Sequence, residues 1–252
     1  MLSYFANPER FNKFAHIASP IIAALAVILA FIGLPLALVF SPQDYQQDHL
    51  VRIMYIHVPA AWTAMGAYTF ISIASAIAFV WRHNLADLAA RAAAPIGLAM
   101  TILTLVTGAV WGKPSWGAWW VWDARLTSVL VLMFIYCGYL AIWDAMDDKK
   151  KAAKFARIFA LVGFINIPII KFSVDWWTSL HQPASIIRVD GPSVTASILT
   201  PLLIMIAAYT AFFAWYVLTG VQGQLRANRA KREQKHTVSI PVTISQGEAD
   251  DG

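Results

Sequence analysis

The stretch IASPIIAALAVILAFIGLPLALVF, residues 17–40, decides the fold class because it contains no charged side chain. A helix needs about 20 apolar residues to cross the hydrocarbon core of a bilayer. The stretch is also longer than the core of a signal peptide, which has about 7–15 apolar residues, so it is expected to remain as a membrane helix. Similar apolar runs follow at 57–81, 92–111, 126–143, 155–174 and 198–219. The sequence therefore predicts an all-α membrane protein with six transmembrane helices.

The composition of the whole chain also favours a bilayer protein. Of its 252 residues, 59% are hydrophobic and 13% are charged, and the mean hydropathy is +0.59. Soluble domains carry about 25% charged residues, so these values argue against a soluble enzyme and against a disordered chain. A transmembrane β-barrel is not expected, because strand-length segments of alternating polarity are absent. The single cysteine, Cys137, excludes a disulfide within the chain.

The basic residues predict the orientation in the membrane. The net charge is +5, and 14 of the 19 Lys and Arg residues fall on the same side as the N-terminus. They are Arg10, Lys13, Arg82, Arg91, Lys149, Lys150, Lys151, Lys154, Arg157, Arg226, Arg229, Lys231, Arg232 and Lys235. The other side holds Arg52, Lys113, Arg125, Lys171 and Arg188. Since loops rich in Lys and Arg stay in the cytoplasm, both termini are expected there, and the positive charge is explained without a nucleic-acid partner.

The predicted organisation has three parts. Residues 1–16 form a cytoplasmic N-terminus, and residues 17–219 form the six-helix membrane domain. Residues 220–252 form a polar cytoplasmic tail, first basic and then acidic, which is expected to be mostly disordered. The loops on the outer, periplasmic side are longer and more aromatic than the loops on the inner side, so they are the expected place for a functional site.

The segment WGKPSWGAWWVWDARLTS at 111–128 is the most unusual part of these loops. It contains Trp111, Trp116, Trp119, Trp120 and Trp122, and then Asp123. Tryptophan is common at membrane interfaces, but five within 12 residues exceed what an interfacial belt requires. If 116–123 is helical, Trp116, Trp119 and Trp120 share one face with Asp123. Such an aromatic wall suits a large, flat, apolar ligand.

Three of the six histidines, His49, His57 and His181, fall on the same outer side. His57 opens the second apolar run, two residues before a proline that the first turn of a helix tolerates. His181 follows a tryptophan pair and shares a helix face with Trp177 if 177–181 is helical. His49 lies in the polar sequence QQDHL and is interpreted as an ordinary loop residue. His57 and His181 are therefore the candidate ligand residues.

The chemistry of two histidines beside an aromatic wall favours haem. Two neutral imidazoles on opposite sides of a flat ring saturate a haem iron, whereas zinc takes three or four ligands and the outer loops have no cysteine. Haem also carries two propionates, and the candidate partners for these are Arg52, Arg125 and Lys113. Arg125 has an alternative of equal weight, an ion pair with nearby Asp123.

Three motifs resemble a known family. The segment at 111–128 resembles the WWD motif of haem-handling membrane proteins in cytochrome c maturation. The flanking segments YIHVPAAW at 55–62 and SVDWWTSLHQ at 173–182 resemble the two histidine signatures of one branch, the haem exporter protein C (CcmC) family. The resemblance covers about residues 40–220 and agrees with six crossings and an outward tryptophan loop.

The resemblance implies a function. A member of this family is not an enzyme, and it holds haem b at the periplasmic face of the bacterial inner membrane. His57 and His181 are the implied axial ligands, and the tryptophan-rich segment is implied to pack against the haem and to help bind the haem chaperone CcmE, which receives it. The other implied partners are CcmA, CcmB and CcmD of an ABC-type complex. This chain has no phosphate-binding motif, so a partner is expected to hydrolyse any ATP.

Two alternatives remain open from the sequence. A periplasmic haem lyase is the closer one, because proteins with a WWD motif include such lyases, although they are generally larger. A membrane cytochrome b with two histidine ligands is the other. Its histidines usually lie within the crossing helices, and no histidine of this chain lies in the middle of an apolar run.

Overall fold

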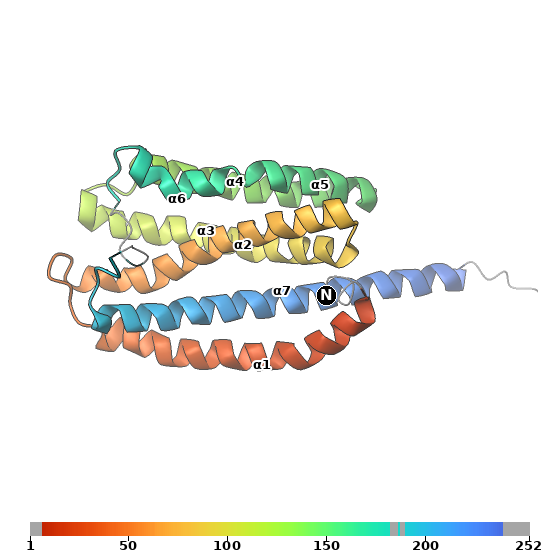
Figure 1. Ribbon diagram of the computed structural model, residues 1–252, viewed down its shortest axis with the longest axis horizontal. Coiled ribbons are helices and arrows are strands. Elements are labelled where there is room, and N and C mark those ends of the chain that lie inside the picture. The colour runs from red at the N-terminus through yellow and green to blue at the C-terminus, as the bar shows by residue number, and fades with distance from the viewer. Residues whose placement is uncertain (1–6, 182–185, 187–189, 239–252) are drawn as a thin grey trace, which may run out of the picture.

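The computed structural model describes residues 7–181, 186 and 190–238, and over these residues the chain consists of helices joined by short loops (Figure 1). The main helices are α1 (Pro8–Pro35), α2 (Met54–Trp81), α3 (Asn84–Trp116), α4 (Ala124–Ala145), α5 (Lys149–Gly163), α6 (Asn166–Trp176) and α7 (Ala196–Val238). A π-helical segment, η1 (Leu36–Phe40), continues α1, and a 3-10 helix, η2 (His49–Ile53), leads into α2. Six described stretches are long and apolar enough to cross a membrane, with α5 and α6 together forming the fifth, so the predicted six-span helical fold is confirmed.

Polar side chains between the apolar runs determine where several helices begin. They accept hydrogen bonds from the free backbone N–H groups of the first turn. Asn7, His83 and Asp148 cap α1, α3 and α5 in this way. At its other end α3 stops where Gly117 has a φ of 79°, a left-handed conformation that costs glycine little. The helices are therefore longer than the apolar runs that predicted them, and α3 extends into the tryptophan-rich segment.

The helices run roughly along one axis (Figure 1). α1 packs mainly on α7, α2 packs mainly on α3, and α4 contacts α3, α5 and α6. An even number of crossings brings the start of α1 and the end of α7 to the same end of the bundle, on the right in Figure 1. The segments that follow α1, α3 and α6 lie at the opposite end. The topology thus gathers the aromatic loops at one end, which we call the loop end.

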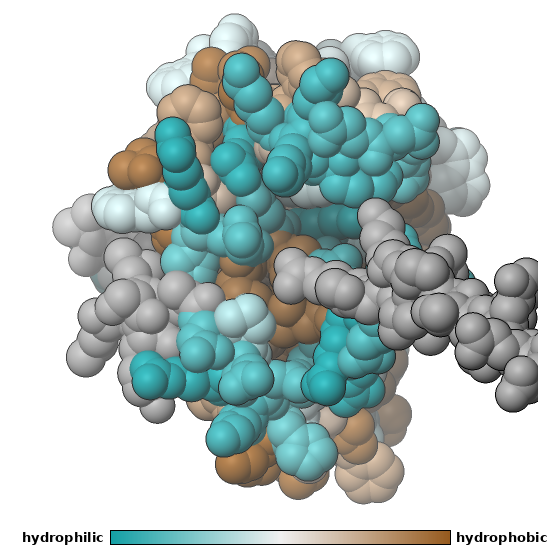
Figure 2. Space-filling model, turned by 90° about the vertical axis from the view of Figure 1, so that its right-hand side faces the viewer, coloured by the Kyte–Doolittle hydropathy of each residue, from teal (hydrophilic) through white to brown (hydrophobic). Residues whose placement is uncertain are grey.

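The end of the bundle away from the loop end is the one to which the sequence analysis assigned most of the basic residues. Figure 2 views this end and shows hydrophilic residues surrounding a hydrophobic centre. α7 continues there to Val238, so residues 220–238 are helical and the prediction of a mostly disordered tail was wrong for this part. Alanine, glutamine, arginine and lysine are frequent in this stretch, and all four favour a helix. The rest of the tail, 239–252, lies outside the described residues.

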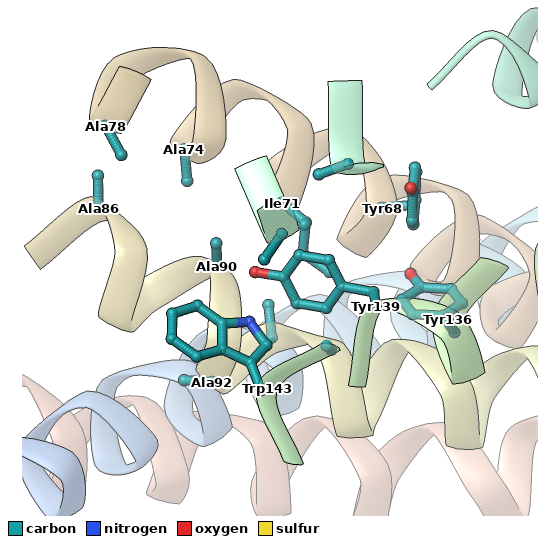
Figure 3. Close-up of a cluster of buried hydrophobic side chains, with 14 of the residues drawn as sticks. Tyr68, Ile71, Ala74, Ala78, Ala86, Ala90, Ala92, Tyr136, Tyr139 and Trp143 are labelled. Carbon is teal, nitrogen blue, oxygen red and sulfur yellow. The ribbon is translucent and has the colours of Figure 1, made fainter. Parts of the chain in front are cut away.

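Small side chains allow the helices to approach each other closely in the core (Figure 3). Ala78 of α2 points toward Ala86 of α3, and both are buried. Membrane helices associate through such close packing of small residues, because lipid offers no hydrophobic driving force between them. The buried aromatic side chains of the cluster fill the space beside α4, and they are Tyr68, Tyr136, Tyr139 and Trp143.

Gly97 on α3 provides a test of this packing. The ring and hydroxyl of Tyr136 occupy the space where a side chain at residue 97 would lie, and the same hydroxyl donates a hydrogen bond to the Ala64 carbonyl at 2.7 Å. Gly97→Ala is therefore expected to destabilise the protein by about 1–3 kcal/mol, because overpacking must displace the tyrosine. Thermal unfolding in detergent measures the effect. Gly66→Ala is the matched control, since nothing lies within 4 Å of a Cβ added there, and an equal loss of Tm in both variants contradicts the prediction.

Candidate functional site

His57 lies in the first turns of α2 at the loop end of the bundle, and its side chain is partly exposed. Its Nδ1 is 3.0 Å from Oγ1 of Thr107 on α3. Its ring meets the ring of Trp111 edge-on, with the centroids 5.7 Å apart. The indole N–H of Trp111 donates to Oε1 of Gln47 at 3.0 Å, which ties this tryptophan to the loop before α2. These contacts engage Nδ1 of His57 and leave Nε2 for a ligand.

His181 lies in the segment after α6, where hydrogen bonds to a neighbouring loop position it. Its Nδ1 is 2.8 Å from Oδ2 of Asp123, and its backbone N–H donates to the Ser179 hydroxyl at 3.1 Å. The same hydroxyl donates to Oδ2 of Asp123 at 2.6 Å. The ring of Trp116 packs edge-on against the His181 ring, with the centroids 5.0 Å apart. The tryptophan-rich segment and the second histidine signature are therefore in direct contact.

Residues 177–181 are not helical, so the condition under which Trp177 and His181 would share a helix face is not met. α6 ends at Trp176, and the backbone of Trp177 is extended, with φ −132° and ψ 154°. Ser179 and His181 then bond to Asp123 instead of continuing the helix. A contact with a distant residue thus replaces the local periodicity assumed from the sequence.

Asp123 connects these parts of the site. Its Oδ1 accepts the backbone N–H of Leu126 at 2.7 Å and so caps α4, while its Oδ2 faces Ser179 and His181. Burial raises the pKa of the Asp123 carboxyl, but the hydrogen bonds from Ser179, Leu126 and His181 outweigh burial, and the pKa is lowered from its ordinary value. Asp123 is therefore a carboxylate at neutral pH, and it accepts a hydrogen bond from the Nδ1–H group of His181.

The electrostatics favour a neutral His181. Burial lowers the pKa of its imidazole, and although Asp123 acts in the opposite direction, the net shift is downward. The neutral ring then carries its proton on Nδ1, where the carboxylate accepts it, and keeps a lone pair on Nε2. Metal-ligating histidines typically have such a partner on the nitrogen that does not bind the metal.

The tryptophans gather at this site, but they do not form one helical face. The condition for a shared face, a helix over 116–123, is not met, because Gly117 ends α3 and α4 begins only after Asp123. In the irregular segment between them, the side chains of Trp119 and Trp122 are 59% and 76% exposed. Nε1 of Trp120 is buried and has no hydrogen-bond partner among the described residues. The segment therefore has an inner side, toward the protein, and an outer side that presents two tryptophans.

Two of the propionate candidates are held by backbone carbonyls. Arg52 donates from Nη2 to the carbonyls of Val39 and Ser41, each at 3.3 Å, while its Nε is buried without a partner in the described part of the chain. Lys113 donates from Nζ to the Gly117 carbonyl at 3.1 Å, across the end of its own helix. Arg52 thus keeps an unused N–H group, whereas Lys113 satisfies the end of α3.

Arg125 lies at the start of α4 and turns toward α6. Its Nε donates to Oγ of Ser173 at 3.3 Å, and its Nη2 to the Lys171 carbonyl at 3.5 Å. Within the described residues it forms no ion pair with Asp123, so that alternative was wrong; His181 and Ser179 engage the carboxylate instead. Arg188 lies outside the described residues.

The structure also separates His49 from the other two histidines by its contacts. His49 is exposed, and its Nε2 is 2.6 Å from Nε2 of Gln43; it is the first residue of η2 and not, as the sequence had suggested, a loop residue. Thr107 and Ser179 were not identified from the sequence. Ser179 stands two residues before His181 and could have been found within that motif. Thr107 is 50 residues from His57, inside an apolar run, and no local pattern marks it.

These features define a multi-pass α-helical membrane protein with two histidines and a tryptophan-rich loop at one end of its bundle. Residues 1–236 match the family model described as "Heme exporter protein C". The chain is 51% identical over 229 residues to Heme exporter protein C of Bradyrhizobium diazoefficiens, covering 91% of this chain and 87% of that protein. It is 44% identical over 228 residues to the protein of that name from Haemophilus influenzae, covering 90% and 93%.

A third relative, a putative cytochrome c biosynthesis ccmC-like mitochondrial protein of Marchantia polymorpha, is 45% identical over 193 residues, which are 77% of this chain and 79% of that protein. The chain belongs to the haem exporter protein C family. The resemblance inferred from the three motifs is thereby confirmed. The protein has a role in haem handling for cytochrome c maturation, as a membrane component and not as an enzyme.

Proposed function

We propose that this protein binds haem b at the periplasmic face of the bacterial inner membrane and delivers it to the haem chaperone CcmE. His57 and His181 are the proposed axial ligands, each through Nε2. CcmA, CcmB and CcmD are the proposed partners in a complex of the ABC type. In this role haem is the cargo, so the site has to hold it specifically and still release it.

One observation carries the proposal. Each of the two histidines has a hydrogen-bond partner at Nδ1, Thr107 for His57 and Asp123 for His181. This is the arrangement expected for two imidazoles that present Nε2 to a metal. Each ring also packs edge-on against a tryptophan, Trp111 or Trp116, so apolar aromatic surface adjoins both proposed ligands. Two imidazoles and a flat aromatic surface fit the chemistry of haem.

Two histidine ligands would leave no open coordination position on the haem iron. Such a site suits transport of haem rather than oxygen chemistry. The protein's own groups perform the positioning. Thr107 and Asp123 orient the rings, and the exposed Trp119 and Trp122 offer an apolar surface to a protein partner. Because the site is built at the loop end and not inside the bundle, a partner can reach it without the helices separating.

Arg52 and Arg125 are the proposed partners of the propionates. Arg52 has a buried Nε–H without a partner in the described residues, so a carboxylate there would satisfy it. Arg125 lies two residues after Asp123, and the hydrogen bonds that its guanidinium donates within the described chain are long, at 3.3 Å and 3.5 Å. Lys113 is supported less well, because its amine already bonds the end of α3.

The orientation is part of the proposal. The loop end faces the periplasm, and both the start of α1 and the end of α7 face the cytoplasm. The distribution of Lys and Arg supports this orientation, since 14 of the 19 belong to segments that the sequence analysis assigned to the end of the bundle away from the loop end.

The test is an absorption spectrum of the full-length protein, purified in detergent with haem supplied, in the oxidised and then the reduced state. We expect sharp, split bands of low-spin haem on reduction, and their loss in a His57→Ala/His181→Ala variant. A second assay measures transfer of the haem to purified CcmE. Haem-free protein despite excess haem, or a high-spin spectrum, contradicts the proposed ligands. A low-spin spectrum without transfer leaves a haem-binding protein but removes the delivery function.

A further inference from the structure

We propose that Thr107 and Gly108 on α3 are positioning residues for His57, with Thr107 setting which nitrogen faces the ligand and Gly108 leaving the space in which the ring lies. The inference rests on the proposed function, in which Nε2 of His57 binds iron. Neither residue belongs to the tryptophan-rich segment or to the two histidine motifs. Both lie one helix away, in a run that the sequence alone presents as an ordinary membrane helix.

The hydrogen bonds of Thr107 determine the tautomer of His57. The Thr107 hydroxyl is 2.7 Å from the Leu103 carbonyl one turn earlier, and a carbonyl can only accept, so the hydroxyl proton points there. Oγ1 then offers a lone pair to Nδ1 of His57, 3.0 Å away. The Thr104 carbonyl, 3.3 Å from the same Oγ1, is a second acceptor for the hydroxyl proton. An accepting Oγ1 on this side requires the proton on Nδ1, which leaves the lone pair of Nε2 free to bind iron.

Gly108 contributes by having no side chain. A Cβ at this position would lie 3.1 Å from Cε1 of His57 and 3.7 Å from its Nδ1. The first distance is too short for an unshifted ring, so any other residue at 108 displaces the imidazole or the helix. Cε1 lies between the two ring nitrogens, so a push there changes the direction of the Nε2 lone pair as well as the contact with Thr107.

The two proposed ligands therefore differ in the group that hydrogen-bonds Nδ1 and in the element that carries the ring. His181 bonds a carboxylate and lies in a loop, whereas His57 bonds a neutral hydroxyl and lies on a helix packed against α3. A carboxylate orients a ring through a charge, but a hydroxyl does so only through geometry. The orientation of His57 consequently depends on the position of the Thr107 hydroxyl and on the space left at Gly108, whereas a charged partner would tolerate small shifts of the ring.

The experiment compares Thr107→Val with Thr107→Ser in the full-length protein loaded with haem. Valine keeps the shape but removes the acceptor, and serine restores it. For the valine variant we expect about tenfold weaker haem binding, the lower part of the range for such partners of ligating histidines. We also expect a higher midpoint potential, since a histidine without its acceptor is a weaker donor to ferric iron. If the whole tenfold loss falls on ferric haem, the rise is about 59 mV.

Matched controls lie on the same helices. Thr101→Val removes a buried hydroxyl that bonds the Gly97 carbonyl in the same way but forms no hydrogen bond with a histidine among the described residues. Gly108→Ala is paired with Gly66→Ala, where an added Cβ meets nothing within 4 Å. We expect Gly108→Ala, like Thr107→Val, to shift the low-spin bands and the potential, whereas Thr107→Ser keeps both at the values of the unchanged protein. Yield and Tm of each variant show whether it folds.

The outcomes separate the inference from the proposed function. If Thr107→Val and Gly108→Ala have the spectrum and potential of their controls, while His57→Ala loses haem, the positioning role is overturned and the ligand assignment stands. If His57→Ala retains a low-spin spectrum, the ligand assignment itself fails, and the inference fails with it. A potential shift in Thr107→Val that serine does not restore also contradicts the role given to the hydroxyl.

Discussion

Alanine at either His57 or His181 is expected to weaken haem binding by about 100-fold or more, whereas His49→Ala leaves it unchanged. Removing a partner of a ligating histidine costs about 10–100-fold in metal affinity, so removing the ligand itself costs at least the upper value. His49 is the matched control because it is a histidine just before α2, exposed and bonded to Gln43. Haem titration of the purified variants, followed by absorbance, measures the affinities.

The spectra of the same variants provide a second readout. A single alanine leaves the iron with one protein ligand, so the low-spin spectrum should become high-spin, and added imidazole should restore it. Equal loss of haem in all three variants contradicts the assignment, because it makes His49 as important as the other two. A low-spin spectrum that survives in His181→Ala assigns the second ligand to another residue.

Replacing both Trp119 and Trp122 by alanine is expected to reduce haem transfer to CcmE by about 30-fold or more, with haem still bound. These side chains are 59% and 76% exposed and therefore contribute little to the fold. A tryptophan that acts as an interface hot spot contributes about 2 kcal/mol or more, and each 1.4 kcal/mol is a factor of ten. Transfer from the loaded protein to purified CcmE, at a chaperone concentration below saturation, measures the effect.

Trp81→Ala is the matched control for the tryptophan variants. Trp81 is 62% exposed, but it ends α2 at the end of the bundle away from the loops. Transfer at the normal rate by the Trp119→Ala/Trp122→Ala variant returns these residues to an ordinary interfacial role. Loss of transfer in the Trp81 variant as well indicates a general effect of removing exposed tryptophans, and removes the argument for a docking surface.

The helical fold was predictable because its signals are local. Each crossing appears in the sequence as an apolar run, and the requirement that lipid imposes on the backbone leaves only a helix for such a run. The break between α5 and α6 lies near Pro168, which interrupts the fifth apolar run in the sequence. The helical continuation of α7 to Val238 was missed, because polar composition was interpreted as disorder without weighing helix propensity.

The site was predictable only in part. The motifs placed His57, His181 and the tryptophans at the same end of the protein, and the structure gathers them there. The shared faces considered for 116–123 and 177–181 depended on each segment being helical, that is, on local periodicity. In the structure Gly117 and the bonds to Asp123 interrupt that periodicity, so the arrangement depends on contacts between segments.

The sequence by itself therefore determined the six crossings, the gathering of the aromatic loops at one end, and the family. All three depend on properties that can be counted along the chain: apolar length, charge and motif. Only the tertiary structure decided which group bonds each histidine. Asp123 meets His181 across 58 residues and Thr107 meets His57 across 50. Such hydrogen bonds depend on the register between packed helices and loops, and no local pattern in the chain records that register.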